Sequence, residues 1–130
     1  IRNSIEDTSD NTGMTLTLAL SYGGRQEIID AVKAIAQQVH SGQLNPEEID
    51  SCLFESFLST QSLPDPDLII RTSGERRISN FLLYQSAYTE LFYSKVLWPD
   101  FSDDDFLNAI IDFQGRERRF GMTQEQIVKA

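Results

Sequence analysis

The stretch DLIIRTSGERRISN, residues 67–80, places a short apolar run directly before a cluster of arginines. The run at 68–70 contains no alternating polar residue, which is typical of a strand covered on both faces of a parallel sheet. Prolines at positions 64 and 66 precede it and disfavour helix there. We therefore expect a short strand over residues 67–72, followed by a loop that carries the arginines.

Two helices are predicted before this strand. Apolar residues recur at three- and four-residue spacing from Arg25 to about Ser41, which predicts an amphipathic helix, and Gly42 is suited to end it. The sequence Asn45-Pro46-Glu47-Glu48 places an N-cap side chain, a proline and a carboxylate in the order of a helix start. We expect this second helix to stop before the prolines at 64 and 66.

Two more helices are predicted after the strand. Ser79 is placed to cap a helical segment over residues 81–84. A final helix begins near residue 102 and runs to about Arg119, with Gly121 closing it. Its first turn holds three consecutive aspartates, which we interpret as complementing the positive end of the helix rather than as a metal cluster.

Residues 14–22, which combine apolar and β-branched residues with partial alternation, are a second predicted strand, and the short segment 90–94, ELFYS, is the third. Strands separated by helices predict an α/β fold with a mostly parallel sheet flanked by helices. Such a sheet is small, so we expect part of the architecture to lie outside this chain. The expected organisation is a polar linker or truncated start over 1–13, part of a single domain over 14–121 and a loose tail over 122–130.

The composition excludes several classes of function. The 130 residues carry a net charge of −9, which leaves no broad basic surface for nucleic acid. No apolar run is long enough to span a bilayer. The single cysteine and single histidine exclude an internal disulfide and argue against a zinc cluster or a Ser-His-Asp triad. We expect Cys52 to be buried and inert, and His40 to lie on the surface near a helix end.

The arginine cluster is the candidate binding site. In an open α/β sheet, ligands collect at the carboxyl ends of the strands, which is where Arg71 falls. Arg77 and the Ser79 hydroxyl follow in the same loop, and guanidinium forks with hydroxyls suit a phosphate or diphosphate. The alternative is a solvated loop whose arginines pair with nearby carboxylates, namely Asp65, Asp67 and Glu75.

Three stretches resemble one family. Residues 64–101, PDPDLIIRTSGERRISNFLLYQSAYTELFYSKVLWPDF, resemble the C-terminal signature of cis-prenyltransferases, the undecaprenyl diphosphate synthase family. LSYGGRQEIIDA at 20–31 resembles a helix start of that family, and QGRERRFG at 114–121 resembles its closing arginine motif. The chain enters the family pattern near its midpoint, without the D-G-N-R-R-W-like motif and the tunnel region, and Ser73 stands where many members have glycine.

The resemblance implies the C-terminal part of a cis-prenyltransferase-type fold and an activity. Members condense isopentenyl diphosphate with an allylic diphosphate, such as farnesyl diphosphate, to a long Z-polyprenyl diphosphate such as undecaprenyl diphosphate. They use Mg²⁺ and work as homodimers or paired heteromers. The implied roles are binding of the isopentenyl diphosphate for Arg71, Arg77 and Ser79, help in holding Mg²⁺ for Glu90, and contact with the partner subunit's active site for Arg119 and Gly121.

Two hypotheses about function follow from the resemblance. In the first, the chain is part of a catalytic enzyme and carries the isopentenyl-diphosphate half-site and dimer elements, while the catalytic residues lie in the missing half, so that the fragment alone is inactive. In the second, it is a non-catalytic partner subunit of a heteromeric enzyme. The intact RTSGERRIS string favours the first. We expect a cytoplasmic protein, either free or peripheral to the membrane that takes up its lipid product.

Overall fold

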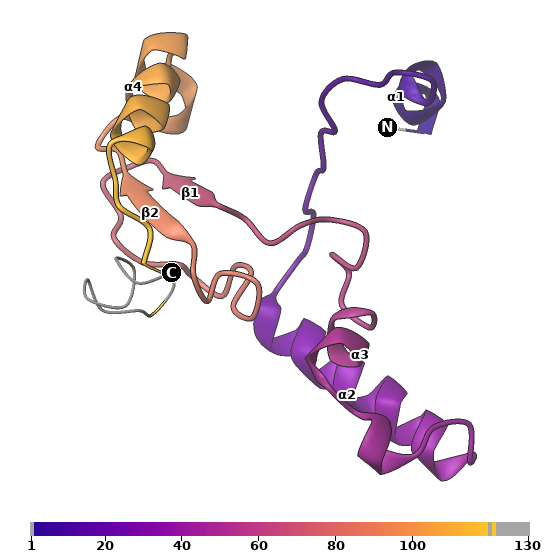
Figure 1. Ribbon diagram of the computed structural model, residues 1–130. Helices are drawn as coiled ribbons and strands as arrows, with labels where there is room; N and C mark the ends of the chain where they lie inside the picture. The colour runs from indigo at the N-terminus through magenta and orange to yellow at the C-terminus, as the bar shows by residue number, and fades with distance from the viewer. Residues whose placement is uncertain (1, 120, 122–130) are drawn as a thin grey trace.

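The computed structural model describes residues 2–119 and 121. Along the chain the elements are α1 (Arg2–Thr8), α2 (Gly24–His40), the 3₁₀ turn η1 (Pro46–Glu48), α3 (Ser51–Glu55), β1 (Leu68–Arg71), β2 (Glu90–Tyr93), the 3₁₀ turn η2 (Trp98–Asp100) and α4 (Asp103–Gln114). Helices α2 and α3 pack together, and α4 packs against β2. Residues 9–23 form an extended arm that connects α1 to α2 (Figure 1).

The two strands confirm the predicted parallel sheet. β1 pairs with β2 in parallel, with Leu68 opposite Glu90 and Arg71 opposite Tyr93. The segment between them, residues 72–89, leads from the carboxyl end of β1 back to the amino end of β2. The apolar sequence of β1 predicts a strand that is buried on both faces. In the structure β1 is only half-buried along its length, so the described residues do not cover both faces completely.

Helix α2 is the predicted amphipathic helix, and Gly42 ends it as expected. Gly42 has a φ of +74°, which is the left-handed conformation favoured by glycine. The N–H of Gly42 donates to the Val39 carbonyl at 3.1 Å and the N–H of Gln43 donates to the Gln38 carbonyl at 2.9 Å. These are the two bonds of a Schellman motif, which satisfies the last carbonyls of the helix. His40 is exposed on its last turn, as predicted.

The next helix begins later than predicted. The Asn45 capping box forms, with the Glu48 carboxylate accepting from the Asn45 N–H at 2.9 Å, but it caps only the short turn η1. The chain is extended again at Ile49, and α3 begins under a second cap, in which Asp50 Oδ1 accepts from the Leu53 N–H at 2.8 Å. An N-cap needs extended backbone, so the second cap prevents one continuous helix. Cys52 lies on this short helix and is exposed, so the prediction of burial is wrong.

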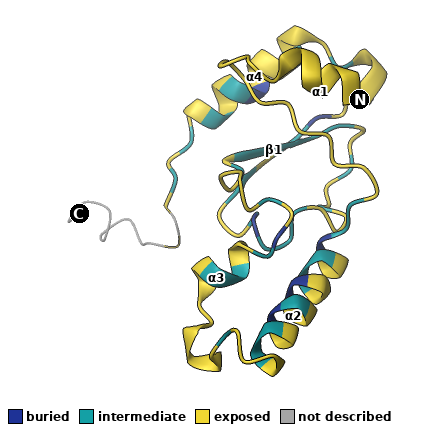
Figure 2. Cartoon of the chain, turned by 90° about the vertical axis from the view of Figure 1, so that its right-hand side faces the viewer, coloured by how far each residue is buried: buried dark blue, intermediate teal, exposed yellow. Residues whose placement is uncertain are grey.

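The predicted strand over residues 14–22 is not a strand in the structure. These residues follow an extended path as far as Ser21, which has a left-handed φ of 54°. They have no strand partner among the described residues, because β1 and β2 pair with each other and the arm lies apart from them (Figure 1). The even-numbered apolar side chains keep the alternation of a strand but are exposed, with Met14 at 89% and Leu16 at 77%. Figure 2 shows α1 and residues 9–21 of the arm as exposed. The expected linker over 1–13 therefore contains a helix, α1.

The helix predicted over residues 81–84 is also absent. Residues 79–88 form successive turns, and Ser79, Asn80 and Leu82 have φ values of 51°, 64° and 46°. A left-handed backbone at these positions is incompatible with an α-helix. The Asn80 carbonyl bonds the Gly24 N–H at 2.7 Å, so a tertiary contact decides the local conformation.

Helix α4 starts as predicted and ends early. Ser102 and Asp105 form a capping box, in which Asp105 Oδ2 accepts from the Ser102 N–H at 2.9 Å, and bonds from Ser102 lower the pKa of the Asp105 carboxyl. Of the three aspartates in the first turn, Asp105 is therefore the one that caps the helix. The helix ends at Gln114 rather than near Arg119, with Gly115, a poor helix former, as its C-cap. Beyond it, the Arg116 side chain donates to the Leu91 carbonyl of β2. The tail predicted over 122–130 lies outside the described residues.

A partly buried polar network ties α2 to the residues just before it and to two later segments of the chain. The Glu27 carboxylate on α2 accepts from Tyr22 Oη at 2.6 Å, from the Ser59 N–H at 3.0 Å and from Gln85 Nε2 at 3.0 Å. Burial raises the pKa of Glu27, but the bonds from Gln85, Ser59 and Tyr22 outweigh it and hold the pKa below its ordinary value. Burial and the Glu27 carboxylate together raise the pKa of Tyr22 to about 12, which keeps its hydroxyl a donor.

None of the described helices is both long enough and apolar enough to cross a lipid bilayer.

The Glu27 network predicts an acid-sensitive contribution to stability. At neutral pH, Glu27→Gln should lower the free energy of unfolding of the full-length protein by about 1–3 kcal/mol, because the charged acceptor of several donors is lost. Since the folded pKa lies below the ordinary value of 4.5, the contribution is complete above pH 4.5 and is lost as the pH falls through the folded pKa. Urea unfolding at several pH values should show the two proteins converging in acid. Asp30→Asn, on the exposed face of the same helix, is the control and should have little effect.

The two helix ends provide a second test. Gly42→Ala should destabilise the full-length protein by about 1 kcal/mol, because a Cβ is strained at a left-handed φ. Gly115→Ala is the matched control, since Gly115 follows α4 with a φ of −78° and its added Cβ would meet only ordinary contacts, the nearest at 3.5 Å. Equal effects of the two substitutions in urea unfolding would contradict the role assigned to Gly42.

Candidate functional site

The loop after β1 is fixed to the residues that follow β2. The Arg71 carbonyl accepts from the Ser94 N–H at 2.8 Å, the Ser73 N–H donates to the Val96 carbonyl at 2.8 Å, and the Gly74 N–H donates to the Ser94 carbonyl at 2.8 Å. Ser73 and Gly74 both have left-handed φ values, 68° and 70°, which turn the chain sharply. The loop therefore starts at the carboxyl ends of both strands, the position predicted for a ligand.

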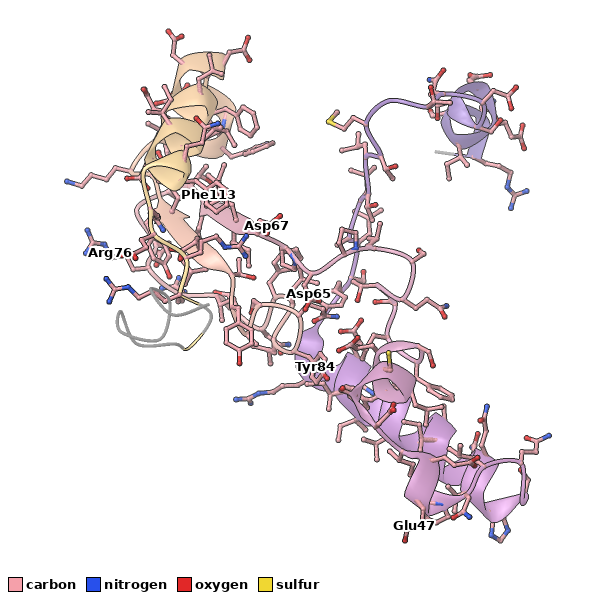
Figure 3. The ribbon with its side chains drawn as sticks, viewed as in Figure 1. Glu47, Asp65, Asp67, Arg76, Tyr84 and Phe113 are labelled. Carbon is pink, nitrogen blue, oxygen red and sulfur yellow. The ribbon has the colours of Figure 1, made fainter. Side chains whose placement is uncertain are left out.

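The arginines of this loop differ in their contacts. Neither Arg71 nor Arg76 makes a side-chain hydrogen bond or ion pair with another residue in the described part of the chain. Arg71 is half-buried, whereas Arg76 is exposed and points away from the ribbon (Figure 3). Arg77 forms an ion pair with Glu75, in which the Arg77 side chain is largely exposed and the Glu75 side chain is partly exposed. Pairing with carboxylates, the alternative to a binding site, thus occurs for Arg77 and not for Arg71.

The end of the loop meets the start of α2. The Ser79 side chain bonds no other residue within the described part of the chain. Its neighbour Asn80 accepts two bonds, from the Gly24 N–H at 2.7 Å to its carbonyl and from the Arg25 N–H at 2.9 Å to its Oδ1. Sequence reasoning missed this contact between positions 55 residues apart. The only signal was the double glycine before α2, which permits a close approach.

Glu90 lies at the other end of the strand pair. It is the first residue of β2 and lies opposite Leu68. Leu68 and Arg71 are three steps apart along β1, which is about 10 Å at the usual rise of a strand. Its Oε2 accepts from Arg116 Nη1 at 2.8 Å, while no bond is recorded for its Oε1 within the described residues. Arg116 also bonds the Asp112 carboxylate and the Leu91 carbonyl at 3.1 Å. The bond to Glu90 is the main cause that raises the pKa of Arg116.

The closing arginine motif lies at this same amino end. Arg118 pairs with Asp67, directly before β1, and its guanidinium lies 5.7 Å from the centre of the Phe113 ring. Phe113 is at the foot of α4, beside the sheet (Figure 3). Sequence reasoning gave no role to Arg116 or Arg118, although both connect α4 to the strands.

Arg119 and Gly121 stand next to this cluster. Arg119 pairs with Glu117 at 3.2 Å, and both side chains are half exposed. Gly121 has a φ of +79°, and a Cβ there would lie 3.7 Å from the Tyr88 ring. The structure thus separates the predicted site residues into two groups. Arg71 ends β1, and Arg77 and Ser79 lie in the loop that follows it. Glu90 lies at the amino end of the strand pair, and Arg119 and Gly121 follow the two arginines that are paired there.

Several known proteins are similar in sequence to this chain. A family model described as "Putative undecaprenyl diphosphate synthase" matches residues 1–121. An isoprenyl transferase of Chlorobaculum tepidum is 57% identical over 124 residues, which are 95% of this chain and 47% of the relative. A tritrans,polycis-undecaprenyl-diphosphate synthase (geranylgeranyl-diphosphate specific) of Thermoplasma volcanium is 54% identical over 93% of this chain and 47% of its own length.

The fold is shared as well. The crystal structure of lavandulyl diphosphate synthase from Lavandula x intermedia, in complex with dimethylallyl diphosphate, is similar with a TM-score of 0.88 and 41% identity, over 93% of this chain and 52% of that one. The chain spans about half the length of the curated relatives it matches. Because the family model covers the loop after β1, the strand pair and the closing arginine motif alike, the chain belongs to the undecaprenyl diphosphate synthase family of prenyltransferases.

Proposed function

We propose that the full-length protein is a Z-polyprenyl diphosphate synthase, which condenses isopentenyl diphosphate with an allylic diphosphate to a long Z-polyprenyl diphosphate such as undecaprenyl diphosphate. The observation that carries the proposal is Arg71, a half-buried guanidinium without a side-chain partner among the described residues, at the carboxyl end of a parallel strand. A relative 57% identical over 95% of this chain, and named an isoprenyl transferase, supports the same activity.

The chemistry assigns a defined task to the loop after β1. Ionisation breaks the bond between the allylic carbon and its diphosphate, which leaves as an anion. The double bond of isopentenyl diphosphate attacks the resulting cation, a carbon–carbon bond forms, and loss of a proton restores a double bond. Arg71, Arg77 and Ser79 would hold the diphosphate of isopentenyl diphosphate, so that its double bond faces the cation.

The Arg77–Glu75 ion pair is compatible with this role. The Arg77 side chain is 63% exposed and the Glu75 side chain 41% exposed, and an ion pair this accessible to solvent contributes little to stability. A diphosphate can therefore replace Glu75 as the partner of Arg77 at small cost. The loop geometry beside it, held by bonds to the residues after β2, need not change.

We infer that Glu90 supplies one ligand to Mg²⁺. Its Oε2 is engaged by Arg116, but no bond is recorded for Oε1 within the described residues. Mg²⁺ commonly takes one or two carboxylates and completes its shell with phosphate oxygens and water, so a single carboxylate from this chain fits. When bound, the ion would neutralise charge on the departing diphosphate. The remaining ligands would come from substrate and from groups outside this chain.

Glu90, Arg119 and Gly121 would act at a subunit interface. They lie at the end of the strand pair remote from Arg71, which favours a site completed by a second copy of the protein. We propose a homodimer in the cytoplasm. Its long apolar product would partition into the membrane surface.

Residues 14–121 would form part of one domain that the rest of the protein completes. The arm exposes the even-numbered apolar residues from Met14 to Leu20, each at 62% or more. A segment with such alternation normally pairs with a sheet and buries its apolar face. In a polypeptide about twice this length, the additional residues would cover that face.

The assignment of Arg71 predicts a substrate-specific effect. In the full-length enzyme, Arg71→Ala should raise the KM for isopentenyl diphosphate by about 10- to 100-fold, because a charge-assisted bond is lost. The matched control is Arg76→Ala, which removes the same charge from the same loop at a side chain that points away (Figure 3). Steady-state kinetics with varied isopentenyl diphosphate separates the two. Equal effects would show that general loop charge, rather than the placement of Arg71, matters.

The assignment of Glu90 predicts a change in metal dependence. Glu90→Gln should raise the Mg²⁺ concentration needed for half-maximal activity of the full-length enzyme by about tenfold or more, because a carboxylate ligand is removed. Asp112→Asn is the matched control, since Asp112 is the other carboxylate bonded to Arg116. A Mg²⁺ titration that shifts equally for both variants would mean that Glu90 acts only by holding Arg116.

A further inference from the structure

The junction between the loop after β1 and helix α2 contains a cap that comes from outside the helix. The first N–H groups of an α-helix have no acceptor within it. In α2 the N-cap residue is Gly23, which has no side chain to supply one. Asn80 takes this role instead, with its carbonyl accepting from the Gly24 N–H at 2.7 Å and its Oδ1 accepting from the Arg25 N–H at 2.9 Å.

The backbone around Asn80 is held in an uncommon conformation. Ser79 and Asn80 have consecutive left-handed φ values of 51° and 64°. Outside glycine, asparagine is among the residues that adopt this conformation most readily, whereas serine is not. The two bonds to α2 therefore stabilise a turn that Ser79 would not adopt by its own preference, and they set the direction in which the Ser79 hydroxyl is presented.

Gly23 and Gly24 make the close approach possible. A Cβ at Gly23 would lie 2.9 Å from Asn80 Nδ2, and one at Gly24 would lie 2.9 Å from Leu83 Cγ and 3.1 Å from the Leu83 backbone nitrogen. Gly23 has an extended backbone, with a φ of −154°, which any residue can adopt. Glycine is needed at position 23 for space rather than for conformation, and the space is occupied by Asn80.

We propose that Asn80 is a positioning residue for the diphosphate of isopentenyl diphosphate. It docks the end of the loop onto the first turn of α2 and thereby holds Ser79, and Arg77 two residues before it, in the orientation that binds substrate. This inference rests on the function proposed above. It adds that the orientation of Arg77 and Ser79 is set by α2, which is itself held in place through Glu27.

The test compares two kinds of cap in the full-length enzyme. Asn80→Gly keeps the left-handed backbone accessible and removes only the amide, so it should raise the KM for isopentenyl diphosphate about fivefold and leave kcat within about twofold. Hydrogen exchange of the amides at the start of α2 should become faster. Asp50→Ala is the control, because it removes the N-cap of α3, away from the loop, and should lower stability without changing KM.

A double-mutant cycle tests the contact itself. Gly23→Ala should also raise the KM, because the new Cβ displaces the Asn80 amide. In the Asn80→Gly background, Gly23→Ala should add little, since the group it displaces is gone. Additive effects of the two substitutions would overturn the proposed contact.

The outcomes separate this inference from the proposed function. If Arg71→Ala raises the KM but Asn80→Gly changes only stability and exchange, Asn80 is a structural cap and the inference is wrong while the function stands. If isopentenyl diphosphate is not a substrate of the full-length protein, the function and the inference both fail. If exchange at the start of α2 is unchanged by Asn80→Gly, the docking itself is refuted whatever the kinetics show.

Discussion

The carboxylate of Glu27 is the constraint on which the arrangement of this chain depends. It accepts hydrogen bonds from Tyr22, Ser59 and Gln85, and so connects the end of the arm, the turns after α3 and the turns before β2. Apolar packing contributes little here, because few hydrophobic residues are buried among those described, namely Ala31, Ile35, Leu58 and Ala109. A charged acceptor with several donors is strong enough to take over part of this task.

This constraint reaches the proposed substrate site through α2. With α2 fixed by Glu27, its first turn provides two N–H groups that Asn80 satisfies, and the loop that carries Arg77 and Ser79 is held against it. The other end of the loop is fixed by bonds between Ser73, Gly74 and the residues after β2. Both ends are thus anchored to regular structure, which suits the proposed task of orienting a diphosphate.

The two ends of the strand pair differ in their electrostatics. At the carboxyl end, Arg71 has no recorded partner among the described residues and is available to an anion. At the amino end, the arginines are paired with carboxylates, Arg116 with Glu90 and Arg118 with Asp67. The chain has a net charge of −9. The arginines that hold α4 against the strands are neutralised by carboxylates, whereas in the described part of the chain Arg71, at the carboxyl end of β1, is not.

The amino-acid sequence by itself determined the elements whose signals are local. Apolar periodicity predicted α2, Gly42 predicted its end, short apolar runs predicted β1 and β2, and Ser102 marked the start of α4. Placing Arg71 at a strand's carboxyl end needed no more than this. Only the tertiary structure decided that residues 79–88 are turns, because the bonds that Asn80 accepts from the start of α2, some 55 positions away, outweigh the local helix preference. It also decided that residues 14–22 are no strand here, since a strand exists only when a neighbour accepts its hydrogen bonds.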